Sequence, residues 1–345
     1  MGKVIYSKLG GQNDAMYGKL DTPIKMLIEN ESNQCEKERT VTKALFNIEK
    51  SSRFGETIIG QSDFDTFQAA VEGAGAENDS IQTTYKKFIE HIQFMKEFTI
   101  TAEMVEDAKT GIALETKSKP KAFVRSYYKT QNKLAALALV NGTAASFTFN
   151  KATVDTTTGD GLPLFSKVHP YHTDELKDQT QSNLYACTAE DTSDTAKFEA
   201  LLNLAANKMR NFKDENGEVM GYTADTIIIP GNRPAFEAIV KKVVGTERTA
   251  GSNNNDINLQ YGNWTVIVLN EWIATEDRFM LMSSEANKAL LGNLFFNRIP
   301  LTIKSWIDNH TSNYIWNGRC RFGVGFGTWK HIMLCVAGGD GTAIA

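Results

Sequence analysis

The chain has 345 residues, of which 41% are hydrophobic and 23% are charged, and these values are typical of a soluble globular protein. Its formal net charge is −4, which excludes a general binder of nucleic acids or membrane surfaces. No run of about eighteen or more apolar residues is present, so no segment is expected to span a bilayer.

The first 50 residues mix acids, bases and glycine without a regular hydrophobic period. Such a segment has too few apolar positions in register to build a core of its own. We therefore expect an N-terminal arm that packs on something else.

Residues 55–100 predict a long two-armed hairpin. The first arm, 55–71, carries Ile58, Ile59, Phe64 and Phe67, and the stretch EGAGAENDS at 72–80 has the small and polar residues of a turn. Residues 86–100 alternate enough to favour a strand, although a helical period fits part of them. Arms of about fifteen residues would reach roughly 50 Å, and a hairpin of that length needs a partner.

A long helix is predicted over 102–140. Thr101 is a suitable N-cap, followed by acidic residues that favour the positive end of the helix dipole. Pro120 should kink the helix or start a second segment after Ser118, and Gly142 should end it. A continuous helix of this length would measure roughly 60 Å.

The next segment, 143–189, shows little periodicity and predicts an ordered loop region. Residues 190–295 predict an α/β unit, with a fully buried strand at 226–229, two further strands at 264–269 and 278–282, a helix that Pro234 opens, and a mobile loop at 245–258. A helix should begin near Ser193 and present one apolar face, formed by Phe198, Leu201, Leu202, Ala205, Met209 and Phe212.

The sequence RCRFGVGFG at 319–327 alternates strictly and predicts a strand. Its apolar face should meet a core. The opposite face carries Gly323, Gly325 and Gly327, so we expect another element to lie close upon it. TWKHIMLCV follows as a strand rather than a helix, which excludes a phosphate-binding GxGxxG motif.

Four segments carry a resemblance to a known family: FIEHIQFMKEFTITAEMVEDAK at 88–109, GDGLPLFSKVHP at 159–170, SNLY at 182–185 and TIIIPGNRPAFEAIV at 226–240. By their order and spacing, the chain resembles the major capsid proteins of tailed bacteriophages, and among them the Mu-type head-subunit group. The resemblance covers nearly the whole chain and implies the Hong Kong ninety-seven-type fold. That α+β fold has an N-terminal arm, an extended β-hairpin loop, a peripheral domain on a long spine helix, and an axial domain.

The implied division of the chain is 1–50 for the arm, 51–100 for the hairpin loop, 101–189 for the peripheral domain with its spine helix, 190–296 for the axial domain, and 297–345 for returning strands of both domains. Many relatives begin with a long helical scaffolding segment, and MGKVIYSKLGGQND does not resemble one. We therefore expect a separate scaffold protein, or a segment that has been cleaved away.

The resemblance further implies a non-enzymatic subunit without cofactors that assembles with copies of itself into hexamers and pentamers of an icosahedral head. Expected partners are scaffold, portal and decoration proteins, and packaged double-stranded DNA through non-specific contacts, with no membrane. The expected location is the virion capsid, assembled in the cytoplasm of a bacterial host. An encapsulin-like shell around a protein cargo is the alternative within the fold.

A metal-dependent hydrolase centred on His169 and His172 is the alternative from another class of protein. The two imidazoles and a following carboxylate, Asp174 or Glu175, could bind zinc. However, Pro170 prevents a regular helix that would place both rings on one face. The four cysteines, at 35, 187, 320 and 335, are too far apart to add ligands, and they predict reduced thiols. We therefore favour a structural role for this stretch.

Charge is concentrated in one place. Between Thr116 and Val154 the chain has no acidic residue. The seven bases there are Lys117, Lys119, Lys121, Arg125, Lys129, Lys133 and Lys151, and five of them recur every four residues as a slowly winding stripe on the predicted helix. The stripe could contact DNA phosphates. We favour solvation or pairing with acids of a neighbouring subunit, for which Glu72, Glu77 and Asp79 at the hairpin tip are candidates.

Overall fold

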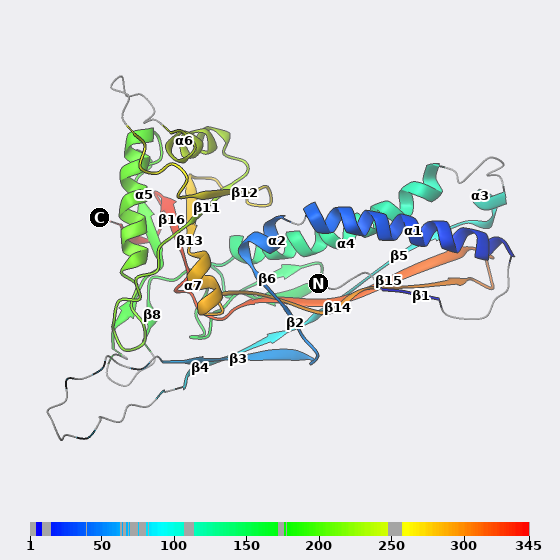
Figure 1. Ribbon diagram of the computed structural model, residues 1–345, viewed down its shortest axis with the longest axis horizontal. Coiled ribbons are helices and arrows are strands. Elements are labelled where there is room, and N and C mark those ends of the chain that lie inside the picture. The colour runs from blue at the N-terminus through cyan, green and yellow to red at the C-terminus, as the bar shows by residue number, and fades with distance from the viewer. Residues whose placement is uncertain are drawn as a thin grey trace.

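The computed structural model describes residues 5–8, 15–38, 40–62, 64, 67, 69, 75, 81, 83–106, 114–171, 176, 178–247 and 257–344. The molecule consists of a long limb and a more compact block at one end of it (Figure 1). Each part has its own sheet, and β15 and β16 follow one another along the chain from the first sheet to the second. No helix among these residues is long and apolar enough to cross a membrane.

The limb is built on a five-stranded sheet. Its strands are β1 (Ile5–Lys8), β2 (Asn47–Lys50), β5 (Ile92–Ile100), β14 (Asn293–Ile307) and β15 (Tyr314–Phe326). β14 and β15 form a long antiparallel ladder, β5 pairs with β15, and β1 and β2 pair in parallel with the outer edge of β14. The helices of the limb are α1 (Ala15–Glu38), α2 (Thr40–Leu45), α3 (Ala102–Glu106) and α4 (Leu114–Val140).

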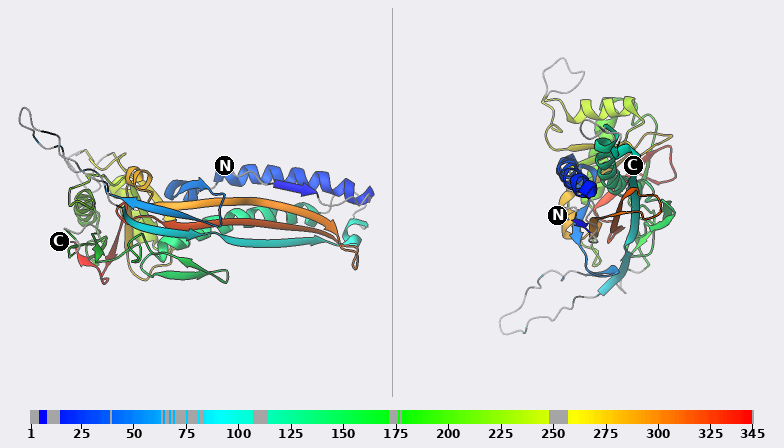
Figure 2. Two further views of the ribbon diagram at one scale, coloured as in Figure 1. Left: turned by 90° about the horizontal axis from the view of Figure 1, so that it is seen from below. Right: turned by 90° about the vertical axis from the view of Figure 1, so that its right-hand side faces the viewer.

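We predicted an arm over 1–50 that packs on something else, and within it the structure has a helix, α1, that the sequence analysis did not predict. α1 packs on α4, and the two helices lie side by side in the end-on view of Figure 2. Ile24, Ile28 and Cys35 of α1 are buried in the main core. In the sequence, polar residues separate these apolar positions. The helix α4 that packs on them is far away along the chain.

The compact block holds a six-stranded mixed sheet. Its order is β12 (Thr265–Leu269), β11 (Thr226–Pro230), β13 (Arg278–Met282), β16 (Ile332–Ala337), β10 (Leu184–Cys187) and β17 (Thr342–Ala343). The block also holds α5 (Thr195–Arg210), α6 (Pro234–Val244) and α7 (Ser284–Ala289). The six residues predicted to form the apolar face of the helix that begins near Ser193, now α5, are all buried. Pro234 is the first residue of α6, and every residue of β11 is buried. These predictions are confirmed.

The predicted hairpin is present in shorter form. β3 (Gly55–Gln61) pairs antiparallel with β4 (Thr83–Glu90). The strand is interrupted at His91. β5 then joins the limb sheet by pairing with β15. The prediction of one arm over 86–100 is therefore wrong, because its second half belongs to the sheet. Most of the predicted tip, 72–80, lies outside the described residues.

Of the long predicted helix the structure describes α3 and α4, and residues 107–113 lie outside the described residues. α4 begins at Leu114 and continues through Pro120, so a second segment does not start after Ser118. Pro120 lies in the second turn and is buried, and its ring removes one backbone hydrogen bond near the start of the helix. The predicted end is confirmed, because the N–H of Gly142 bonds to the carbonyl of Leu139 beyond the last residue of α4.

Residues 143–189 contain strands that the sequence analysis missed. β6 (Ser146–Phe149) and β7 (Ala152–Asp155) form a hairpin, and β8 (His169–Pro170) pairs with β9 (Thr180–Gln181). Asn150 and Lys151 connect β6 to β7 with φ values of 47° and 72°. Such a turn normally carries glycine. Because Asn-Lys stands there instead, no turn signal for this hairpin is present in the sequence.

The glycines at the end of β15 and directly after it lie close to other segments of the same chain, as predicted. A Cβ on Gly323 would lie 2.6 Å from the carbonyl oxygen of Glu90, and one on Gly327 would lie 2.3 Å from that of Leu291. A Cβ on Gly325 would meet the Ile89 side chain at 2.5 Å. The absence of side chains at Gly323 and Gly325 lets the end of β4 cross β15 where the hairpin leaves the limb.

Replacing Gly323 by Ala should therefore lower the free energy of unfolding by about 1–3 kcal/mol, because the methyl group would press on backbone that cannot rotate away. Gly75→Ala is the matched control, since a Cβ there would meet nothing within 4 Å. Chemical denaturation of both variants checks this. Equal stability of the two variants would contradict the close approach.

Candidate functional site

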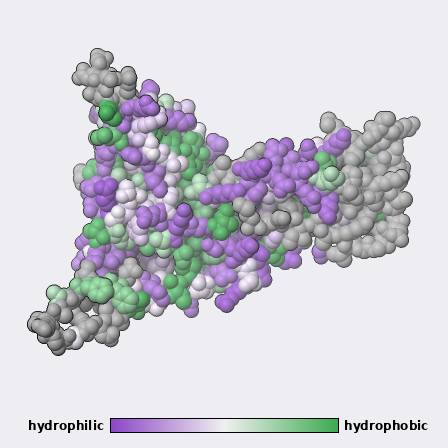
Figure 3. Space-filling model, in the orientation of Figure 1, coloured by the Kyte–Doolittle hydropathy of each residue, from purple (hydrophilic) through white to green (hydrophobic). Residues whose placement is uncertain are grey.

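The hairpin exposes an unusual number of large apolar side chains. The exposed set in and beside it is Phe54, Ile59, Phe64, Phe67, Ile81 and Phe88. Phe64 is 61% exposed and Phe67 is fully exposed. Apolar surface at this corner of the molecule is visible at the lower left of Figure 3. Exposed apolar patches on a folded chain mark interaction surfaces, so the hairpin is a candidate interface.

The hairpin is anchored firmly to the rest of the chain at its root. The buried side chain of Lys87 donates hydrogen bonds to Asp155 Oδ2 and Thr157 Oγ1, both at 2.5 Å. The ring of Tyr85 fills the space that side chains at Gly60 and Gly159 would occupy, and burial raises the pKa of this tyrosine to about 12. The loop that follows β7 therefore sets the direction in which the hairpin leaves the molecule.

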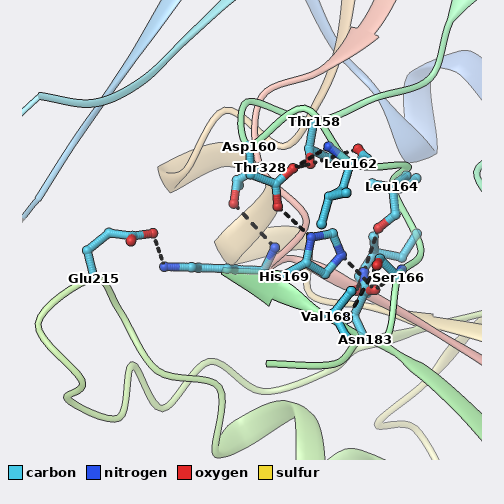
Figure 4. Close-up of polar contacts among 12 residues, drawn as sticks. Thr158, Asp160, Leu162, Leu164, Ser166, Val168, His169, Asn183, Glu215 and Thr328 are labelled. Atoms are coloured by element: carbon cyan, nitrogen blue, oxygen red, sulfur yellow. Dashed lines mark hydrogen bonds and ion pairs between the residues drawn. The ribbon is translucent and has the colours of Figure 1, made fainter. Parts of the chain in front are cut away.

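His169 lies in the same loop region and is fully buried. Its Nδ1 lies 2.6 Å from Asp160 Oδ2, and its Nε2 lies 3.1 Å from Asn183 Oδ1 (Figure 4). The imidazole also stacks on the ring of Trp329, with 4.4 Å between ring centroids. Asp160 accepts further hydrogen bonds from the Thr158 hydroxyl and the Leu162 N–H. We call His169, Asp160 and Asn183 the polar knot.

The orientation of Asn183 decides what His169 can do. The Asn183 amide nitrogen donates to the carbonyls of Leu164 and Ile332, and Asn183 Oδ1 accepts from the Ser166 N–H. Its oxygen therefore faces His169, whose Nε2 must donate, while Nδ1 donates to the Asp160 carboxylate. With both nitrogens donating, His169 has no lone pair for a metal ion.

Asp160 remains the ionised partner in this arrangement. Burial favours its neutral form, but the hydrogen bond and the charge of His169 outweigh this and lower the pKa of the carboxyl. His172, Asp174 and Glu175 lie outside the described residues. Within the described part of the chain, no group of three His, Cys, Asp or Glu side chains could hold a metal ion.

The structure shows where the bases of the predicted stripe lie on α4. Lys117, Arg125, Lys129 and Lys133 are exposed, whereas Lys119 and Lys121 are half-buried. Lys119 Nζ donates to the carbonyl of Thr99. Arg125 pairs with Glu31 of α1, whose side chain is only 5% exposed. The stripe thus helps to fix α1 on α4, a role that the sequence analysis did not assign. The acidic candidates Glu72, Glu77 and Asp79 lie outside the described residues.

A family model described as phage capsid protein matches residues 87–333, well over half of the chain. The chain belongs to this phage capsid family. The matched region starts at the anchor Lys87 and extends through the limb sheet into β16, so it contains the polar knot and most of the compact block. No curated protein matches the sequence significantly.

Solved structures agree with the family on the fold. A chain from Mycobacterium phage Patience is 13% identical, with a TM-score of 0.52, and the match covers 98% of this capsid protein and 94% of that chain. The capsid of cyanophage P-SCSP1u is 10% identical, with a TM-score of 0.55 and coverage of 87% and 88%. The mature capsid of bacteriophage PhiM1 is 10% identical, with a TM-score of 0.50 and coverage of 85% and 84%.

The predicted α+β capsid fold and the predicted role as a structural subunit of a capsid shell are confirmed. The capsid protein is thereby assigned to the virion shell. The Mu-type and Hong Kong ninety-seven-type assignments stay predictions. The encapsulin-like shell and the hydrolase are not favoured, and the donor geometry of His169 argues independently against zinc.

Replacing Asp160 by Asn should destabilise the capsid protein by about 3 kcal/mol at neutral pH, because it removes one partner of a buried charged pair. Since the folded pKa of Asp160 is lowered, its contribution is present above the unfolded value of about 3.9 and is lost as the pH falls below it. Denaturation curves should therefore converge for the two proteins at acid pH. Asp178→Asn, at an exposed position in the same region, is the control and should follow the parent. A constant difference at all pH values would contradict this account.

Replacing Arg125 by Gln should cost about 1–3 kcal/mol, because it leaves the shielded Glu31 carboxylate without its cation. Lys129→Gln, one turn further along the exposed stripe, should change stability by less than about 0.5 kcal/mol. Thermal unfolding of unassembled subunits compares them. If neither substitution lowers the thermal stability, the basic stripe does not hold α1 on α4.

Proposed function

We propose that the capsid protein assembles into the hexamers and pentamers of an icosahedral head, and that its hairpin lies across a neighbouring copy. The observation that carries this proposal is the exposure of Phe64 and Phe67, which follow β3 of a hairpin whose other strand is fixed at Lys87. Each aromatic ring buries about 150–250 Å² when it is fully covered. At about 25 cal/mol per Å² of apolar area, two such rings supply a substantial driving force for association.

The arrangement of the root supports a neighbour as the target of the hairpin. Lys87, Tyr85 and the glycines of β15 hold the root against the limb, so the hairpin is not free to fold back onto its own core. A fixed arm keeps little conformational freedom to lose on binding, which favours affinity. Repeated around a closed ring of subunits, many weak contacts of this kind act together.

The exposed bases of α4 have a smaller part in the proposal. Arg125 is already paired with Glu31, which leaves Lys117, Lys129 and Lys133 as the exposed cations of the stripe. We favour solvation or contact with acidic residues of a neighbouring copy for them. Contact with packaged DNA is the second candidate, and it would show a steep dependence on salt.

The remaining parts of the proposal follow from membership of a capsid family. We infer a non-enzymatic role, assembly in the cytoplasm of a bacterial host with scaffold and portal proteins, and decoration of the finished head. The five-part division into arm, hairpin loop, peripheral domain, axial domain and returning strands belongs to the same proposal. It is supported by the separation of the limb sheet from the block sheet.

Replacing Phe64 and Phe67 together by Gln should leave a folded subunit and should abolish or strongly reduce shell formation. Both rings are exposed in the single chain, so their loss removes no part of the core. Met26→Gln on α1 is the control, because Met26 is 60% exposed and thus comparable with Phe64. Sedimentation and electron microscopy of the purified proteins measure assembly. Closed particles from the double variant at parental yield would refute the proposed role of the hairpin.

A further inference from the structure

A cavity lies between α4 and the edge strand of the limb sheet. β5 is the last strand of that sheet, and the cavity beside it has a volume of about 180 Å³. Its apolar part is lined by Phe94, Phe123, Tyr127, Leu301, Gly318 and Cys320. An engineered apolar cavity of about 150 Å³ binds benzene. The space is therefore the right size for one aromatic ring.

A cation stands where this cavity opens to solvent. Lys96 and Met95 of β5 line it and are exposed. Lys96 Nζ donates a hydrogen bond to Ser126 Oγ of α4 at 2.9 Å, so the two elements approach each other there. The neighbouring acid, Glu97, accepts a hydrogen bond from Asn317 Nδ2 at 3.3 Å. A ring that enters the cavity would thus pass a solvated ammonium group, which aromatic faces attract.

The helix beside the cavity adds positive charge. Between Thr116 and Val154 the chain carries seven bases and no acid. One of these bases, Lys129, is exposed and lies between the lining residues Ser126 and Thr130 along α4. Complementary charge guides partners into register and excludes wrong ones. The cavity therefore favours a ring carried by an acidic segment.

The hairpin of a second copy has this composition. Phe64 stands between Asp63 and Asp65 in the sequence, and the stretch from Asp63 to Asp79 holds five acids and no Lys or Arg. The Phe64 side chain is 61% exposed, so its ring is accessible to a partner. Phe67 is exposed too, but its neighbours in the sequence are uncharged. Phe64 therefore matches both the size of the cavity and the charge at its opening.

The ring and the cavity of one chain do not meet. Phe64 is not among the residues that line the cavity. The hairpin strands β3 and β4 leave the limb on the side of its sheet opposite to α4 (Figures 1 and 2). Lys87 and the close packing at Gly323 and Gly325 fix that direction. The hairpin can therefore reach this cavity only on another copy.

We propose that this cavity, the ring socket, receives Phe64 of a second copy of this chain, with Asp63 and Asp65 of that copy at the rim beside Lys96 and Lys129. The inference rests on the proposed function, because it names the place on the neighbour that the hairpin binds. Burial of the ring removes apolar surface from water on both partners. A buried aromatic anchor within a polar rim is the usual arrangement of protein interfaces.

The first test fills the ring socket from its own chain. Ser126→Phe introduces a ring at a half-buried lining position, and Ser118→Phe is the control, because it makes the same change at an exposed position of α4. In unassembled subunits, Ser126→Phe should leave the melting temperature unchanged or raise it, since it fills a void. Its assembly should need at least about tenfold more protein than that of the control. Assembly of both variants at the same concentration would overturn the proposal.

The second test locates the partner of Phe64 and does not depend on the Ser126→Phe variant. Phe64→p-azidophenylalanine keeps the ring. On illumination the azide loses dinitrogen, and the remaining nitrogen inserts into a nearby C–H or N–H bond. Shells are formed from a mixture of isotopically heavy and light subunits and are analysed by mass spectrometry.

We expect the probe at position 64 to link two different copies, with the bond at Lys96, Ser126 or Tyr127. The same probe at position 67 is the control, and its yield of links to these residues should be at least about tenfold lower. Links from position 64 that fall elsewhere, that join residues of one copy only, or that do not form would overturn the proposal. An equal yield from position 67 would also overturn it.

The two proposals fail in different ways. If the loss of Phe64 and Phe67 prevents assembly while Ser126→Phe assembles like its control, the ring socket is wrong and the hairpin interface stands. If the double variant at Phe64 and Phe67 assembles normally, the proposed function is wrong, and the ring socket is excluded with it.

Discussion

The β14–β15 ladder is the constraint on which the rest of the subunit depends. It pairs Asn293–Ile307 with Tyr314–Phe326 along the limb, and β15 leads through a short turn into β16 of the second sheet. The glycines at 323 and 325 let the end of β4 cross it closely, at the Glu90 carbonyl and the Ile89 side chain. The hairpin therefore starts from a fixed point on the most extensive ladder of the protein.

The loop after β7 connects this ladder to the compact block. Asp155 accepts a hydrogen bond from Lys87 of the hairpin, and Asp160, a few residues later, accepts one from His169. Asn183 then links His169 to the carbonyl of Ile332 at the start of β16. The segment from Asp155 to Asn183 thus joins the hairpin, the limb and the block sheet through polar contacts, and those among Asp160, His169 and Asn183 are buried. Such contacts are costly to leave half-made, which favours a single relative orientation of the three parts.

Local patterns predicted the elements whose burial is visible in short stretches of sequence. α5 has a regular apolar face, β11 is buried throughout, and Pro234 marks the start of α6, so hydrophobic periodicity and the position of proline were sufficient. α1 was missed because Ile24, Ile28 and Cys35 gain their burial from α4, far away in sequence. The break at His91 could not be predicted either, because the pairing of β5 with β15 joins residues more than two hundred positions apart.

The site shows the same limit. The apolar content of the hairpin and the close glycine face could be read from residue types, as could the improbability of zinc at His169. The partners Asp160, Asn183 and Trp329 could not, because only the fold brings them around the imidazole.

The central claim is that the hairpin is buried against a neighbouring copy in the shell. A cryo-electron microscopy reconstruction of purified particles tests it directly, at a resolution that shows side chains. The account predicts density for β3 and β4 across an adjacent subunit, with Phe64 and Phe67 in contact with that subunit. A hairpin that projects into solvent, or that folds back onto its own limb, would contradict it.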